Sequence, residues 1–259
     1  MLYSSLDAVA WWLLFACLVA LFQLAFEAAF RVSHHWHAKQ ERRRFANAGL
    51  VLGSLLALDG IVLAFGFSIA DGRFQKRREL VLDEANAIQT TFLRADVLPP
   101  RHTEEVRQLL RRYLDVRLGV QHPGDLAPAL AASRSIQMAL WTEAMAAARE
   151  DRDSKTIPLF IESLNKLLDL HEARLTLGTY YRLPEPMLIT MFVVSLLAIM
   201  VLGMVAGMSA RSFWPTLAFI IAVASLLVLV VELDRPWHQL FEVSQGALVD
   251  VQKAIANGP

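Results

Sequence analysis

Long apolar blocks alternate with amphipathic stretches along the chain, and this pattern predicts an all-α integral membrane protein. Four blocks, at about residues 8–30, 48–70, 187–207 and 213–231, each approach the roughly 20 residues that a helix needs to cross a bilayer. We therefore predict four transmembrane helices in two hairpins, with a helical soluble domain inserted between helices 2 and 3. The predicted organisation is hairpin 1 in 1–70, the soluble domain in 71–185, hairpin 2 in 186–231 and a C-terminal tail in 232–259.

Apolar side chains recur at helical spacing throughout the inserted region, which predicts four helices there. The first continues directly from the second span, because no proline interrupts the chain before Pro99. The predicted bounds are about 71–99, 103–118, 129–149 and 154–177, with Thr103 as the N-cap of the second helix and Ser154 or Thr156 at the start of the fourth.

The stretch 80–99 of the first of these helices has two distinct faces. An apolar stripe is expected to pack inward, and a polar stripe lies about opposite to it. The polar stripe offers a carboxylate, an amide, a hydroxyl and a guanidinium in a row. The apolar stripe is Val81, Ala85, Ile88, Phe92 and Ala95, and the polar stripe is Asp83, Asn86, Thr90 and Arg94.

One carboxylate, that of Asp59, falls at the middle of the second span. A charge at that depth costs several kcal/mol unless it is protonated, paired or facing water. Two interpretations stay open: a hydrogen bond to a neighbouring helix, or a role in a proton or ion path. Gly49 with Gly53, and Gly203 with Gly207, form GxxxG patterns that favour close contact between helices.

A dense charged cluster follows the fourth span, where the helix leaves the bilayer. It contains Glu232, Asp234 and Arg235. These side chains either mark the membrane interface or fix the tail against the soluble helices. We refer to them as the membrane-exit cluster.

The composition narrows the range of functions. With 25 basic and 25 acidic residues the chain has no basic excess, so nucleic acid is not an expected partner. The single cysteine excludes an internal disulfide. No nucleophile elbow, phosphate loop or dinucleotide fingerprint occurs, and His34, His35 and His37 do not have the usual spacing of helical zinc ligands. We therefore expect no enzyme activity, no metal and no cofactor.

The distribution of basic residues bears on orientation. The loop 31–47 carries five lysines and arginines, namely Arg31, Lys39, Arg42, Arg43 and Arg44, which by the positive-inside rule favours a cytoplasmic position. The soluble domain then lies on the non-cytoplasmic side. Arg73, Lys76, Arg77 and Arg78 directly after the second span favour the opposite orientation.

Three segments resemble the bestrophin-like family of bacterial membrane proteins. They are 78–99, 109–118 (LLRRYLDVRL) and 233–237 (LDRPW), and the two-plus-two arrangement of spans agrees. The family has no assigned reaction, but its relation to bestrophins implies an oligomeric anion channel in the bacterial inner membrane. In bestrophins the helical soluble part is cytosolic, which is opposite to the orientation that the loop charges favour. The bestrophin pore and calcium-clasp motifs do not occur in this chain.

Two functions follow from these observations. In the first, a ring of subunits forms an ion channel, and Asp59, Asp83, Asn86, Thr90 and Arg94 provide its polar lining. In the second, the protein is a non-conducting membrane scaffold or sensor whose helical domain binds a partner. The same polar residues then form an interhelical network or a docking surface.

Overall fold

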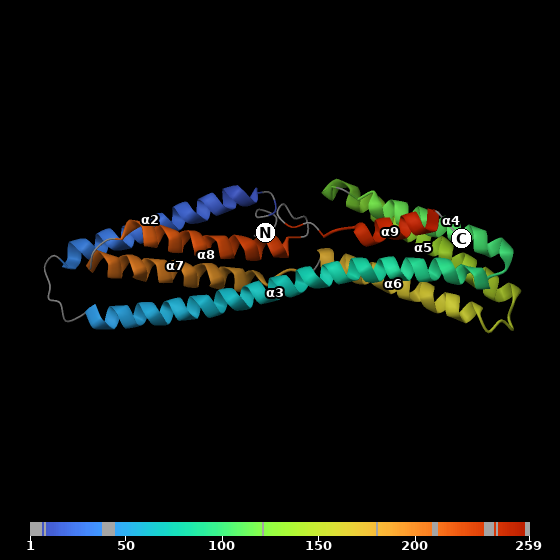
Figure 1. Cartoon of the computed structure of the whole chain (residues 1–259), viewed down its shortest axis with the longest axis horizontal. Helices are drawn as coiled ribbons and strands as arrows, with labels where there is room; N and C mark the ends of the chain where they lie inside the picture. Colours follow the sequence, from blue (N-terminus) through green and yellow to red (C-terminus); the bar gives the residue numbers. More distant parts are fainter. Residues whose placement is uncertain are drawn as a thin grey trace. The chain divides into compact units, whose positions relative to one another are not determined.

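The computed structural model describes residues 7, 9–37, 45–120, 122–179, 181–208, 212–235, 241 and 243–256. Every regular element among these residues is a helix, which confirms the all-α prediction (Figure 1). Two short 3₁₀ turns, η2 (Ala95–Val97) and η3 (Pro123–Asp125), join longer helices. The longer helices are α2 (Trp11–His37), α3 (Phe45–Arg94), α4 (Pro100–Leu118), α5 (Leu126–Glu150), α6 (Ile157–Thr179), α7 (Glu185–Met208), α8 (Phe213–Asp234) and α9 (Gly246–Ala256).

Four of the described helices, α2, α3, α7 and α8, are long and apolar enough to cross a membrane. They coincide with the four predicted spans. Helix α3 is 50 residues long, so it continues well beyond its apolar block without interruption. This confirms the prediction that the second span and the first helix of the inserted region are one element.

The chain divides into two compact units, and each has its own core. Unit 1 comprises Met1–Phe74 and Arg182–Glu242, and unit 2 comprises Gln75–Tyr181 and Val243–Pro259. Helix α3 contributes to both units. The C-terminal tail, predicted as a separate segment, contributes α9 to unit 2, where Leu248, Val251 and Ile255 are buried in its core.

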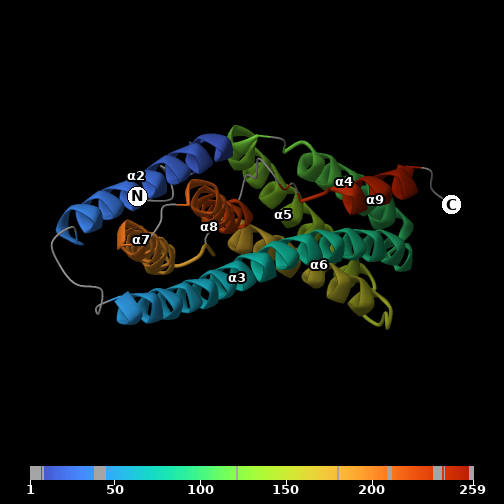
Figure 2. The same ribbon diagram turned by 60° about the vertical axis from the view of Figure 1, so that its left-hand side comes forward.

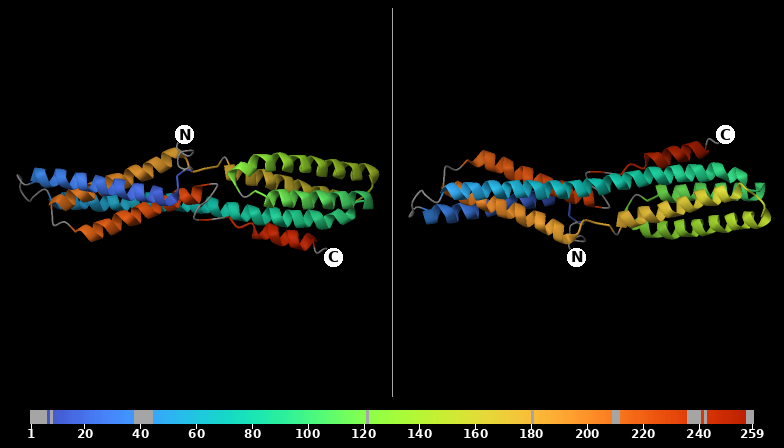
Figure 3. Two further views of the ribbon diagram at one scale, coloured as in Figure 1. Left: turned by 90° about the horizontal axis from the view of Figure 1, so that it is seen from above. Right: turned by 90° about the horizontal axis from the view of Figure 1, so that it is seen from below.

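In unit 1, α2 packs against α7 and α8, and the helices run side by side in both views of Figure 3. Two glycines of α7 allow the closest approach. A Cβ atom on Gly203 would lie 2.5 Å from the carbonyl oxygen of Phe26, and one on Gly207 would lie 2.6 Å from that of Phe30. The prediction of close helix contact thus holds for this pair of glycines.

The other GxxxG pattern makes no such contact. A Cβ atom on Gly49 or Gly53 would meet nothing within 4 Å in the described part of the chain. The expectation of close helix contact at these two glycines is therefore not met within this chain. A GxxxG pattern indicates a surface that allows close approach, but a second helix must also be present there.

Unit 2 is a bundle of α4, α5, α6 and α9 with the C-terminal half of α3 (Figure 2). The apolar stripe predicted for α3 is buried in its core without exception. Helix α4 begins at Pro100, not near Thr103 as predicted. Proline suits a first helical position because it has no N–H to leave unsatisfied, and the Thr103 hydroxyl instead donates to the carbonyl oxygen of Ala95 at 3.0 Å.

Candidate functional site

The polar stripe of α3 is divided in the structure. Asn86 and Thr90 are exposed and Asp83 is partly exposed. None of these three side chains has a hydrogen bond or ion pair with another described residue. Arg94 instead reaches α6, where it donates to the carbonyl oxygen of Leu159 at 2.7 Å and lies 3.8 Å from the Glu162 carboxylate. The stripe therefore presents a carboxylate, an amide and a hydroxyl on the outer face of unit 2.

The opposite face of the same helix carries a buried charge, the carboxylate of Glu84, which is fully inaccessible. Tyr113 of α4 donates its hydroxyl to Glu84 Oε1 at 2.6 Å. Arg117 Nε lies 3.0 Å from the same oxygen, and Arg174 of α6 donates to Oε2. One carboxylate thus joins three helices and offsets two largely buried guanidinium groups, which would each be costly without it.

His171 and Gln245 extend this cluster. His171 of α6 places Nδ1 2.9 Å from the Tyr113 hydroxyl, and Arg174 Nη2 donates to Oε1 of Gln245 at 2.7 Å. Gln245 directly precedes α9. We call Glu84, Tyr113, Arg117, His171, Arg174 and Gln245 the Glu84 cluster. It connects α3, α4 and α6 to the start of the C-terminal helix.

Burial and neighbouring charges shift the pKa values of two members of the Glu84 cluster, Tyr113 and His171. Burial and the neighbouring Glu84 carboxylate raise the pKa of Tyr113 well above its usual value. Burial and the Arg117 guanidinium lower the pKa of His171. At neutral pH both side chains are therefore uncharged, and the cluster holds one carboxylate and two guanidinium groups.

Sequence reasoning did not identify this cluster as a site, although three of its residues lie in segments that carry the family resemblance. Glu84 lies in the 78–99 segment, and Tyr113 and Arg117 lie in LLRRYLDVRL. His171 and Arg174 lie in the helix predicted at 154–177, and Gln245 lies in the C-terminal tail. The signal that could have found Glu84 is its phase, because it stands three residues after Val81 and four before Ile88 on the buried face.

Asp59 is buried in unit 1 and faces α7. It accepts a hydrogen bond of 2.7 Å from the Ser195 hydroxyl. Two turns further along α3, the Met191 side chain rests directly on Gly66. Small and polar residues thus hold the spanning half of α3 against α7 at these two points.

The membrane-exit cluster is buried in unit 1. Glu232 and Arg235 form an ion pair with each other. Asp234 accepts a hydrogen bond of 2.9 Å from the backbone N–H of Leu183 and lies 3.6 Å from the Arg73 guanidinium. Asp234 therefore fixes the end of α8 to α3 and to the segment that leads into α7.

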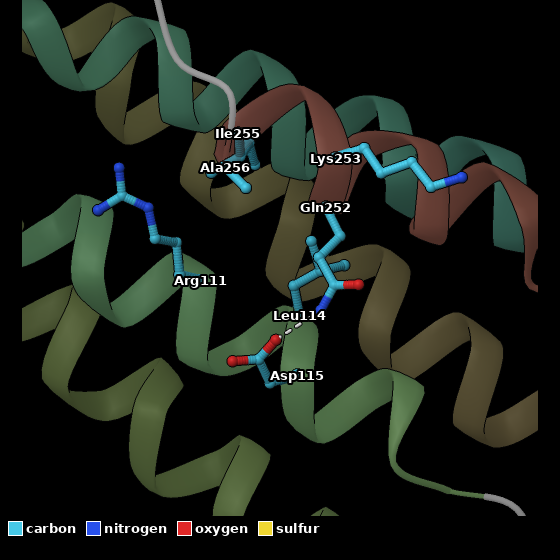
Figure 4. Close-up of a pocket in the computed structure, with 7 residues that line it drawn as sticks. All are labelled: Arg111, Leu114, Asp115, Gln252, Lys253, Ile255 and Ala256. Atoms are coloured by element: carbon cyan, nitrogen blue, oxygen red, sulfur yellow. Dashed lines mark hydrogen bonds between the residues drawn. The ribbon is translucent and has the colours of Figure 1, made fainter.

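A pocket of about 360 Å³ lies between α4 and α9 (Figure 4). Its apolar wall is formed by Leu114, Ile255 and Ala256, and Arg111 and Lys253 provide positive charge. Gln252 donates to the Asp115 carboxylate at 2.7 Å across the pocket.

No metal site is formed in the described part of the chain, because no three His, Cys, Asp or Glu side chains gather there as a metal site requires.

Comparison with known proteins establishes the family. The model of the Bestrophin-like domain matches residues 19–248. A crystal structure of a bacterial Bestrophin homolog from Klebsiella pneumoniae aligns with a TM-score of 0.66 at 16% identity, covering 94% of this chain and 96% of that chain. A tryptophan-to-alanine variant of that homolog aligns with a TM-score of 0.69 at 16% identity over the same shares. At this identity the likeness shows the fold alone. A search among curated proteins detects no relative of this sequence. The chain belongs to the Bestrophin-like family.

Proposed function

We propose that this protein is one subunit of an oligomeric ion channel of the bacterial inner membrane, with α3 beside the conduction path. The observation that carries this proposal is the outer face of α3. Its side chains Asp83, Asn86 and Thr90 have no hydrogen bond or ion pair with other described residues, although the helix is continuous with a membrane span. Membership of the Bestrophin-like family supports the proposal, because the related bestrophins are anion channels.

An assembly of several chains is needed to form the path. The spanning half of α3 presents large apolar side chains outward, and Phe65 is 65% exposed within one chain. Its inward side chain Asp59 is closed off by Ser195 of the same chain. In this proposal the path runs along the outer face of α3, between subunits arranged in a ring.

Within this proposal the polar residues of α3 have different roles. Asp83, Asn86 and Thr90 line the path outside the bilayer, and Arg94 stiffens its end through α6. Asp59 holds α3 to α7 and acts on the path indirectly. The Asp83 carboxylate repels anions, so its removal favours anion conduction over cation conduction.

Ion flux from liposomes tests the proposal. The protein is first purified as an oligomer, its mass is verified, and chloride and potassium fluxes are then measured. We expect flux in the wild type, and Asp83→Asn is expected to shift the chloride-to-potassium ratio toward chloride. Asp153→Asn, on the turn after α5, is the matched control and is expected to leave the ratio unchanged. Liposomes that contain a verified oligomer but show no chloride or potassium flux would contradict the channel proposal.

A non-conducting sensor is the second candidate, and the pocket between α4 and α9 favours it. An apolar wall with two nearby cations suits an amphiphilic anion. In this case the purified protein is a monomer or dimer and its liposomes are silent. Native mass measurement in a membrane-like environment separates the two candidates.

The side of the membrane that unit 2 occupies forms a separate part of the proposal. The loop charges favour the non-cytoplasmic side, whereas the relation to bestrophins implies the cytosol. A cysteine placed at Met138, which is 67% exposed, reports the side by its reaction with an impermeant maleimide on intact cells. The experiment uses a Cys17→Ser background, because Cys17 is a free and exposed thiol.

A further inference from the structure

The hydrogen bonds of the Glu84 cluster fix the position of a proton on His171. Tyr113 has one hydroxyl proton, and it is donated to the Glu84 carboxylate at 2.6 Å. The His171 Nδ1 atom, 2.9 Å from the same hydroxyl oxygen, must then donate its own proton to that oxygen. Neutral His171 therefore carries its proton on Nδ1, and its Nε2 atom is an unprotonated nitrogen with a free lone pair.

This Nε2 atom is buried and has no hydrogen-bond partner among the described residues. His171 itself is 0% exposed. A proton that binds at Nε2 would thus place a third cation beside the two guanidinium groups that share Glu84, with no acceptor for the new N–H. The closed cluster strongly disfavours this charge.

Charged groups on three helices act on His171. Arg117 on α4 and Arg174 on α6 oppose its protonation, while Glu84 on α3 and Glu172 on α6 favour it. The lowered pKa of His171 shows that burial and the arginines prevail. His171 binds a proton more tightly when the cluster is open and the side chain is hydrated than when the cluster is closed. Acid therefore favours opening of the cluster.

Within unit 2, we expect helix α9 to open most readily. Helix α9 has 11 residues and is the shortest α-helix of unit 2. It is held by three buried apolar side chains, by the Gln252–Asp115 hydrogen bond and, through Gln245, by Arg174 of the cluster. Short elements with few anchors open at lower free energy than the core.

We propose that His171 is a proton-binding site that couples mildly acidic pH to release of the C-terminal helix α9. The solvent supplies the proton, Nε2 accepts it, and the imidazolium becomes hydrated as the cluster opens. Arg174 then loses Gln245 as an acceptor, and α9 detaches from α4. The proposed pH-dependent release of α9 does not require that the protein conducts ions.

Hydrogen exchange of the amides in 246–256 tests the proposal in the full-length protein in lipid nanodiscs. Exchange times are scaled at each pH for the intrinsic pH dependence of amide exchange. In the wild type, the opening constant of α9 is expected to rise up to about tenfold per pH unit as the pH falls below about 6.5. The rise levels off once His171 is protonated in the closed state as well.

His171→Asn is the decisive variant, because its carboxamide N–H can still donate to Tyr113 but does not titrate. It is expected to abolish the pH dependence of α9 exchange. His122→Asn, which removes an exposed histidine of the same unit, is expected to preserve it. The same pH dependence in wild type and His171→Asn, or no pH dependence in the wild type, would overturn the proposal.

Nitrogen NMR of ¹⁵N-histidine-labelled wild-type protein provides a second reading that needs no variant at His171. Above pH 7 the His171 shifts are expected to report a protonated Nδ1 and a bare Nε2. A proton on Nε2 in this range would contradict the proposal. So would a titration of His171 that leaves α9 exchange unchanged.

Discussion

At the scale of single residues, Glu84 is the side chain on which the interior of unit 2 depends most. Among the described residues, it is the only carboxylate that Tyr113, Arg117 and Arg174 contact. Two largely buried guanidinium groups surround it, so its charge cannot be removed without leaving both uncompensated. Thr91, another buried polar residue on this face, donates its hydroxyl to the Ala87 carbonyl oxygen at 2.7 Å.

Replacing Glu84 by glutamine tests this dependence. We expect Glu84→Gln to lower the free energy of unfolding of unit 2 by about 3–5 kcal/mol, the usual cost of breaking a buried ion pair. The free energy of unfolding is measured by chemical denaturation, which is monitored with a probe in unit 2. Glu162→Gln is the matched control, because Glu162 is exposed beside Arg94 and its loss should cost less than about 1 kcal/mol. Equal effects of the two variants would show that the Glu84 charge is unimportant.

At the scale of elements, a GxxxG pattern forms a close helix contact only where a second helix of the chain packs against it. The two GxxxG patterns are alike in sequence, yet only the one in α7 meets another helix of this chain. Polar contacts reinforce the same pair of helices, since the Ser33 hydroxyl of α2 donates to the Met204 carbonyl oxygen at 2.8 Å. Backbone approach of this kind leaves no room for a larger side chain.

Substitution of these glycines by alanine separates the two cases. Gly203→Ala places a methyl group against the rigid carbonyl of Phe26, and we expect a loss of about 1–3 kcal/mol from overpacking. Gly53→Ala meets nothing within 4 Å and should leave the stability unchanged or raise it slightly. Thermal unfolding in detergent compares the two variants. A Gly203→Ala protein as stable as Gly53→Ala would contradict the α2–α7 contact.

At the scale of the whole molecule, the sequence predicted the spans and the continuity of α3 because both depend on local hydropathy. It also predicted which face of α3 is buried. It did not predict the Glu84 cluster, because that cluster forms through contacts between side chains as much as 90 residues apart, and these contacts depend on helix packing. The start of α4 differs from the prediction for a local reason, since Pro100 is the first residue of α4 and does not precede the helix.

The outer face of α3 is central to the proposed channel, and cysteine modification of that face tests it most directly. Thr90→Cys in a Cys17→Ser background is reconstituted as a verified oligomer, and current is recorded while a charged thiol reagent is added. Met138→Cys, on an exposed face of α5, is the control. We predict that the reagent changes the current through Thr90→Cys by at least half and leaves that through Met138→Cys unchanged. A conducting Thr90→Cys oligomer that is fully modified without any change in current would contradict the placement of α3 beside the path.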